Sequence, residues 1–132
     1  MSITGYDHLA ITVTDIDVTT VFYERLFGVR RGAEYAPNGK PLHRQIFFGD
    51  TKMNLHQAGN GVELVAQKPT PGSVDVCFRW NKPIETAVAL LARHNVAIVD
   101  GPSPRTLSDG RPSQSVYFRD PDGNLIELMA AV

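Results

Sequence analysis

One supersecondary pattern occurs twice in this chain of 132 residues, and the repeat constrains the fold more than any other feature. The segment 6–13, YDHLAITV, alternates like a β-strand. An amphipathic stretch that ends at Gly28 follows it, and then three further strand-like segments. The same order returns after residue 73, where Pro83 occupies the predicted first helical position. The repeat predicts an α+β fold built from two copies of one β-α-β-β-β module.

Composition and apolar spacing set the expected boundaries. We place the first module at about residues 4–58, a linker at about 59–72 and the second module at about 73–130, all in a single domain. The stretch 101–113, rich in Gly, Pro and Ser, is predicted to be a long loop, either an active-site lid or disordered. The predicted strands cover 6–13, 29–35, 43–48, 53–57, 73–80, 96–99, 114–119 and 124–129. The predicted buried stripes are Val18, Val21, Phe22 and Leu26 on the first helix, with Asp17 as N-cap, and Ile84, Ala87, Val88 and Leu91 on the second.

Charge and cysteine content narrow the class of protein. The formal net charge of −1 provides no electrostatic basis for binding nucleic acid or a membrane surface. No apolar run approaches the roughly 20 residues that cross a bilayer. The single cysteine, Cys77, excludes an intrachain disulfide and favours a reducing cytoplasm. These features indicate an ordinary globular protein of the cytoplasm that binds neither nucleic acid nor a membrane surface.

Four side chains with metal-binding chemistry lie on the strand faces opposite the apolar ones: His8, His56, Asp75 and Glu127. His8 and Asp75 each open the first strand of a module, whereas His56 and Glu127 each lie near the end of a last strand. The four are therefore predicted to occupy equivalent positions and to converge. Two imidazoles and two carboxylates suit a divalent cation, which would compensate a carboxylate placed in an otherwise apolar strand.

Each of these residues also has a structural interpretation. A strand histidine such as His8 or His56 is commonly a hydrogen-bonded structural residue. Glu127 is open to interpretation as a solvated carboxylate, and Asp75 as a turn cap or a partner of Arg79. The repeat favours a shared site, because unrelated residues should not recur at equivalent positions of two modules.

The motifs DHLAITV, KMNLHQ, GSVDVCF and YFRDPDGNLIEL resemble those of the vicinal oxygen chelate superfamily. This superfamily includes glyoxalase I, fosfomycin-resistance thiol transferases, bleomycin-resistance proteins and extradiol dioxygenases, and the chain is most similar to its small glyoxalase-domain-containing branch. The resemblance implies two βαβββ modules that form an open eight-stranded, barrel-like sheet around a metal cleft, with the helices outside. It also implies a homodimer, with modules exchanged between chains in some members.

The same resemblance implies metal ligands at His8, His56 and Glu127, with Asp75 as a further ligand, a base or a residue that orients a histidine. Glyoxalase I usually has a carboxylate where His56 stands and a histidine where Asp75 stands, so the chain departs from that ligand order. The implied cofactor is Zn, Ni, Co, Mn or Fe(II), with a thiol such as glutathione as a candidate cosubstrate.

Three functions follow from the resemblance. The first is a lactoylglutathione-lyase-like metalloenzyme, in which the ion stabilises an enediolate and Glu127 or Asp75 moves the proton. The second is an Fe(II) extradiol-type dioxygenase. The third is a non-catalytic resistance protein that sequesters a small molecule such as an antibiotic and retains no ion. Weaker candidates for contact with substrate are Arg79, Arg105, Tyr117 and Arg119.

Overall fold

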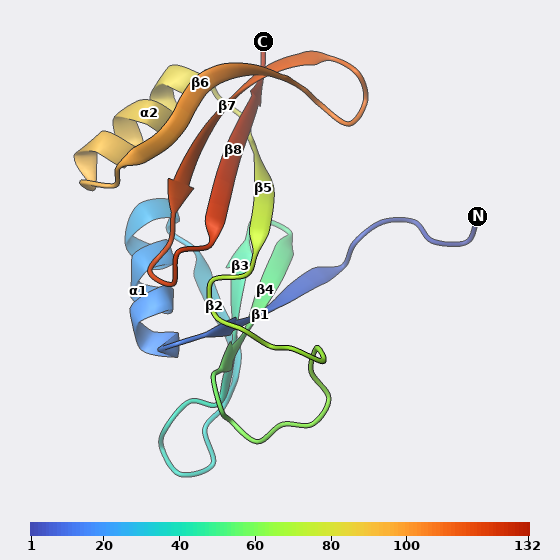
Figure 1. Cartoon of the computed structure of the whole chain (residues 1–132), viewed down its shortest axis with the longest axis vertical. Coiled ribbons are helices and arrows are strands. Elements are labelled where there is room, and N and C mark those ends of the chain that lie inside the picture. The colour runs from blue at the N-terminus through green and yellow to red at the C-terminus, as the bar shows by residue number, and fades with distance from the viewer. The chain divides into compact units, whose positions relative to one another are not determined.

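The computed structural model describes all 132 residues as two compact units, Met1–Gly72 (unit 1) and Ser73–Val132 (unit 2). Each unit contains one helix and four strands in the order β-α-β-β-β (Figure 1). The predicted α+β fold of two repeated modules is therefore confirmed. The eight strands form two separate four-stranded sheets, one in each unit, rather than one continuous hydrogen-bonded sheet.

Unit 1 carries its sheet in the order β1-β4-β3-β2. Strand β1 runs parallel to β4, while the β2–β3 and β3–β4 pairs are antiparallel. The parallel pair requires a crossover, and α1 lies within that crossover. The elements are β1 (His8–Val13), α1 (Ile16–Phe27), β2 (Arg30–Tyr35), β3 (His43–Phe48) and β4 (Thr51–Gln57).

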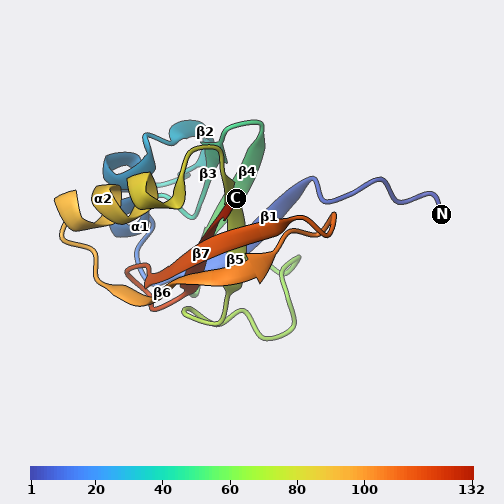
Figure 2. The same cartoon turned by 90° about the horizontal axis from the view of Figure 1, so that it is seen from above.

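Unit 2 repeats this topology with the order β5-β8-β7-β6. Strand β5 runs parallel to β8, and the β6–β7 and β7–β8 pairs are antiparallel. Figures 1 and 2 show α2 along one face of this sheet, where it contacts β6, β7 and β8. The elements are β5 (Asp75–Trp80), α2 (Ile84–Arg93), β6 (Ile98–Thr106), β7 (Pro112–Arg119) and β8 (Leu125–Ala131).

The helix-facing sides of the strands form the two cores, as alternation predicts. Ile11, Val13, Met53 and Leu55 are buried in unit 1, and Val116, Phe118, Ile126 and Leu128 are buried in unit 2. The other side of each sheet carries the polar residues that are candidates for function.

The predicted stripe of the first helix is wrong in part. Val18 and Val21 are exposed, whereas Thr19 and Thr20 are buried. The buried Thr20 satisfies its hydroxyl by donating to the Ile16 carbonyl at 2.6 Å. The helix N-cap is Asp15, whose carboxylate accepts from two backbone N–H groups, and not Asp17. On α2 the predicted Ile84, Ala87 and Leu91 are buried.

The predicted long loop 101–113 is also wrong, because β6 continues to Thr106. Glycine and proline in this stretch favour a loop, but β6 is the edge strand of its sheet, where a missing N–H donor is tolerated. Only residues 107–111 connect β6 to β7, so these residues do not form a long lid.

The turn between β7 and β8 is built on Asp120. Its carboxylate accepts from the backbone N–H groups of Asp122 and Asn124 at 3.0 Å each and from the Asn124 side chain at 2.9 Å. Asn124 Oδ1 then accepts from the Val74 N–H at 2.9 Å, which ties the turn to the start of β5. This network sets the register of β8 and therefore the direction of Glu127.

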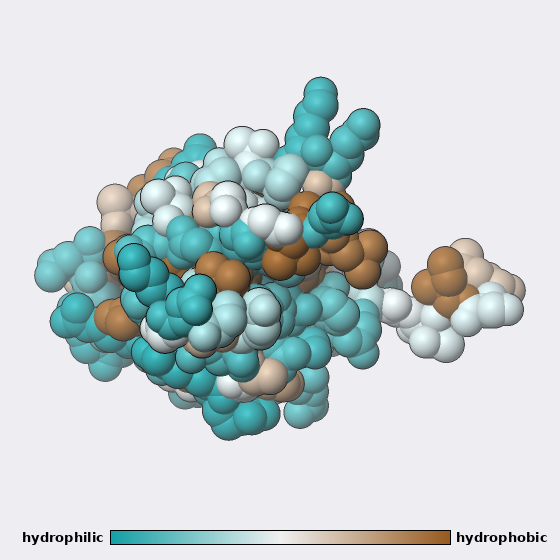
Figure 3. Space-filling view, turned by 90° about the horizontal axis from the view of Figure 1, so that it is seen from below, coloured by the Kyte–Doolittle hydropathy of each residue, from teal (hydrophilic) through white to brown (hydrophobic).

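With 12 and 10 residues, α1 and α2 are both too short to span a bilayer as apolar helices. In the view of Figure 3, hydrophobic side chains appear as separate groups within a largely hydrophilic surface.

Candidate functional site

Glu127 lies in the middle of the unit 2 sheet, between two strands. It pairs with Cys77 of β5 on one side and with Tyr117 of β7 on the other. Because residues paired directly across a sheet point to the same side, the three side chains form one row on the face away from α2. Glu127 Oε2 is buried and has no hydrogen-bond partner. An uncompensated buried carboxylate oxygen is costly, and a cation is one means of compensating it.

The neighbours of Glu127 respond to its charge. Burial raises the pKa of the Cys77 thiol to about 12, and the charge of Glu127 and hydrogen bonding to it contribute to that rise. Burial likewise raises the pKa of Tyr117. The hydrogen bond from Arg105 lowers this pKa, whereas the charge of Glu127 and hydrogen bonding to Glu127 raise it further. Cys77 is an exposed residue, but a pKa of about 12 keeps its thiol protonated at neutral pH. It is therefore a poor nucleophile at neutral pH.

Arg105 and Tyr117, both predicted to contact substrate, bind each other. Arg105 Nε donates to the Tyr117 hydroxyl at 2.9 Å, and the guanidinium carbon lies 5.5 Å from the ring centroid. The other two predicted arginines have separate partners. Arg79 donates to the Ser108 hydroxyl at 3.2 Å, and Arg119 donates to the Gly123 carbonyl at 3.2 Å.

Asp75 opens β5 and is exposed. Its partner on β8 is Leu125, so it lies one row away from Glu127 on the same face. Within unit 2, the structure therefore places both predicted carboxylates on one face, with Glu127 in the more buried position.

His8 opens β1 and has a carboxylate partner. Its Nδ1 lies 2.8 Å from Asp7 Oδ1, and the hydrogen bond to His8 is the main cause of a lowered Asp7 pKa. A carboxylate bound to one imidazole nitrogen orients the ring and leaves the other nitrogen, Nε2, available to coordinate a metal ion.

His56 lies at the other end of the β1–β4 pair from His8. His8 is opposite Lys52, whereas His56 is opposite Thr12, an offset of four residues, or roughly 13 Å along the strand. The structure does not bring these two predicted ligands together within unit 1. Neither unit gathers three or more His, Cys, Asp or Glu side chains into a group that could hold a metal ion.

His56 instead contacts His43, which the sequence did not place. The two residues pair across β3 and β4, and their rings lie 4.9 Å apart between centroids at 64°. The Asn60 amide donates to His56 Nδ1 at 3.4 Å, a contact that suits the neutral imidazole. The tight turn that pairs Phe48 with Thr51 sets the register of this hairpin. Counting back from that turn along both strands would have paired His43 with His56.

The histidine pair makes stability depend on pH. Burial lowers the pKa of both rings below 6.5, and the charge of His56 lowers that of His43 further. As the pH falls, the histidines of the unfolded chain therefore bind protons at a higher pH than those of the folded chain. The free energy of unfolding should be at its full value above pH 6.5 and should decrease as the pH falls below that value. We expect the variant H43Q/H56Q to show a weaker dependence in urea unfolding between about pH 5.5 and 7.5.

The exposed His94 provides the control for this experiment, and H94Q should retain the wild-type dependence. A wild-type slope in H43Q/H56Q would show that other groups are responsible.

The equivalence predicted for His56 and Glu127 is wrong by two residues. Glu127 pairs with Cys77, which is the third residue of β5. The third residue of β1 is Ala10, and it pairs with Asn54 and not with His56. Asn54 Oδ1 is buried without a hydrogen-bond partner, as is Glu127 Oε2. The two units therefore carry an unpartnered oxygen at the same position, and sequence spacing alone missed Asn54.

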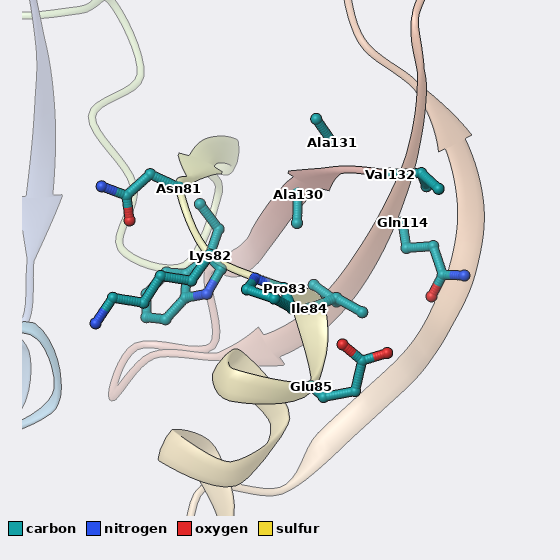
Figure 4. Close-up of a pocket in the computed structure, with 10 residues that line it drawn as sticks. Asn81, Lys82, Pro83, Ile84, Glu85, Gln114, Ala130, Ala131 and Val132 are labelled. Atoms are coloured by element: carbon teal, nitrogen blue, oxygen red, sulfur yellow. The ribbon is translucent and has the colours of Figure 1, made fainter.

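A pocket of about 480 Å³ lies elsewhere in unit 2, at the start of α2 (Figure 4). Strand alternation places its residues Trp80, Gln114 and Ala130 on the face opposite Glu127. This pocket is therefore separate from the row that contains Glu127. The lining residues are Trp80, Asn81, Lys82, Pro83, Ile84, Glu85, Gln114, Ala130, Ala131 and Val132.

The chain is similar in sequence and structure to several known proteins. The chain is 42% identical over 128 residues to virulence protein STM3117 of Salmonella typhimurium, covering 97% of this chain and 85% of that protein. It is also 42% identical over 128 residues to glyoxalase domain-containing protein RDO1 of Mycosarcoma maydis, covering 97% and 69%. The crystal structure of STM3117 superimposes with a TM-score of 0.86 at 40% identity, covering 100% of both chains.

Solved structures extend the likeness. An integron cassette protein of V. Cholerae has a TM-score of 0.87 at 40% identity, covering 98% of this chain and 97% of that chain. FosX of Listeria monocytogenes, crystallised with Mn(II), has a TM-score of 0.67 at 19% identity, covering 98% and 92%, a likeness of fold alone. The family described as the Glyoxalase/Bleomycin resistance protein/Dioxygenase superfamily matches residues 5–128. The chain therefore belongs to this superfamily, the vicinal oxygen chelate superfamily that its motifs resemble.

Proposed function

We propose that this protein is a divalent-metal-dependent enzyme of glyoxalase-like type that acts on a small oxygen-bearing substrate. The observation that carries the proposal is Glu127, a strand carboxylate with one buried oxygen that has no hydrogen-bond partner. The match to the superfamily and the 42% identity to a glyoxalase domain-containing protein support it.

The proposed donors have the chemistry of divalent-cation ligands. Glu127 supplies an anionic oxygen, and His8 supplies Nε2 from a ring that Asp7 orients. Asp75 and Asn54 supply further oxygens, at the start of β5 and on β4. Imidazole and carboxylate donors suit Zn, Ni, Co, Mn or Fe(II). His56 remains a proposed ligand, although it has a competing partner in His43.

The chain's own residues have distinct roles in this proposal. When bound, a divalent ion supplies Lewis acidity that stabilises negative charge on a substrate oxygen. Asp75 is the exposed carboxylate of the face and is suited to accept and return a proton at its carboxylate oxygens. Glu127 is half-buried with one fully buried oxygen, and it is suited to hold the ion. Cys77, with a pKa of about 12, takes no part as a nucleophile.

Metal binding tests the proposal. We expect wild-type protein to bind Mn²⁺, Ni²⁺ or Zn²⁺ in chelator competition and H8A to bind at least roughly tenfold more weakly, because an imidazole donor is lost. H94A, which removes an exposed histidine at the end of α2, should bind like wild type. Wild-type protein that binds none of these ions would contradict the proposal and favour the binding-protein alternative.

Activity then separates the enzymatic classes. Conversion of the hemithioacetal of methylglyoxal and glutathione to its thioester would support the glyoxalase-like reaction. Oxygen uptake with Fe²⁺ and a catechol would favour the ring-cleaving alternative instead.

A further inference from the structure

We propose that Tyr117, held by Arg105, is a positioning residue that fixes the orientation of the Glu127 carboxylate. The three side chains come from the adjacent strands β6, β7 and β8. The inference rests on the proposed function for the identity of the ion that Glu127 holds. The contacts themselves lie entirely within unit 2.

The hydrogen bonds run in one direction. Arg105 has only donors, and its Nε donates to the Tyr117 oxygen at 2.9 Å. The Tyr117 O–H is therefore left to donate, and the residue opposite it across the strands is Glu127, an acceptor when ionised. Hydrogen bonding between Tyr117 and Glu127 is among the interactions that raise the pKa of Tyr117, after burial. In the proposed arrangement the chain of donors ends on the carboxylate.

Arg105 is fixed within unit 2. Its Nη1 donates to the Pro104 carbonyl at 2.8 Å, and its Nη2 lies 3.7 Å from Asp100 Oδ2. Every guanidinium nitrogen therefore has a partner, and the planar group also lies near the Tyr117 ring. An arginine with this set of partners is better suited to hold a neighbouring side chain than to receive a substrate anion. This assigns Arg105 and Tyr117 to Glu127 and not to the substrate.

The two carboxylate oxygens of Glu127 have different surroundings in this arrangement. Oε2 has no hydrogen-bond partner, so in the proposed arrangement the Tyr117 hydroxyl donates to Oε1. A carboxylate held at one oxygen keeps a defined direction for the second, which is the requirement for a metal ligand. Without the Tyr117 hydroxyl, the glutamate side chain gains rotamer freedom that ion binding must then remove.

Chelator competition with Co²⁺ tests the inference in the metal-bound protein. We expect Y117F, which keeps the ring and removes the hydroxyl, to lower Co²⁺ affinity by roughly 10- to 100-fold and to shift the visible Co²⁺ spectrum. R105Q should do the same to a smaller extent. The double variant should be no weaker than Y117F alone, because Arg105 acts through Tyr117. The matched control is Y35F, which changes an exposed tyrosine of β2.

Carbon NMR tests the positioning without any metal. With glutamate labelled at the side-chain carboxyl, the Glu127 signal is identified by its loss in E127Q. We expect Y117F and R105Q to move this signal at fixed pH, while Y35F leaves it in place. R105Q changes a residue that is 43% exposed, so it serves if Y117F does not fold.

The two outcomes are separable. A Glu127 signal that stays in place in both Y117F and R105Q would overturn the positioning role. Wild-type protein that binds no Co²⁺ or other divalent ion would overturn the proposed function, and the carbon signal would then decide the positioning role on its own.

Discussion

E127Q should lower divalent-metal affinity by about 100-fold or more while the fold stays intact. The substitution keeps the shape of the side chain and removes its charge. Loss of a residue that only orients a ligand already costs roughly 10- to 100-fold, and Glu127 is proposed to be a ligand itself. Chelator competition with Ni²⁺ or Mn²⁺ measures the change. The matched control is E63Q, which removes an exposed carboxylate from the segment that follows β4 in unit 1.

The metal-free protein should respond in the opposite sense. Glu127 Oε2 is buried without a partner, so replacing the carboxylate by a neutral amide removes a desolvation cost. We therefore expect the free energy of unfolding of E127Q to equal or exceed that of wild type. Loss of metal binding together with loss of stability would indicate instead that Glu127 is a structural residue.

Cys77 reports on the same substitution. It is the only cysteine of the chain, and its pKa of about 12 depends on burial first and on the Glu127 charge second. Alkylation by iodoacetamide at fixed pH should be faster in E127Q, because the thiolate no longer faces a carboxylate. An unchanged rate would show that Glu127 does not influence the thiol.

Strand alternation predicts the faces of the sheets correctly. It places Glu127 opposite Ile126 and Leu128, which are buried against the helix side. It does not predict which residues pair across neighbouring strands. Pairing depends on turns such as the one built on Asp120, and an error of two residues exchanges His56 for Asn54 as the counterpart of Glu127.

The spacing of hydrophobic residues predicts buried positions less well where polar side chains are buried together with a partner. Counting hydrophobic residues assigns Val18 and Val21 to the core, yet both are exposed. Thr20 takes a core position because its hydroxyl bonds within α1 and with Arg44. Contacts of this kind, like that between Arg105 and Tyr117, join residues that no periodicity relates.

R44A should destabilise unit 1 by about 2–3 kcal/mol. Arg44 is only 5% exposed, and it joins β3 to α1 and β2. Its Nε donates to Glu34 at 2.6 Å, and its Nη1 lies 2.9 Å from the Thr20 hydroxyl and 3.0 Å from Asp17. Breaking a buried ion pair costs roughly 3–5 kcal/mol. The carboxylates of Asp17 and Glu34 are 66% and 40% exposed and regain water, so the expected cost is lower.

Two further variants separate charge from packing. R31A breaks an exposed pair with Glu24 at 2.9 Å and should cost only about 0.2–1 kcal/mol. R44M keeps much of the buried volume and should lie between wild type and R44A. Equal losses in R31A and R44A would show that burial of Arg44 contributes nothing beyond a surface ion pair.

The position of the single tryptophan makes the R44A measurement sharper. Trp80 lies in unit 2, so its fluorescence follows that unit, whereas far-UV circular dichroism follows both. Urea unfolding of R44A should therefore shift the circular dichroism transition. If the fluorescence transition shifts with it, the two units unfold as one cooperative body. If it stays in place, unit 2 keeps its stability while unit 1 loses its own, and the 2–3 kcal/mol applies to unit 1 alone.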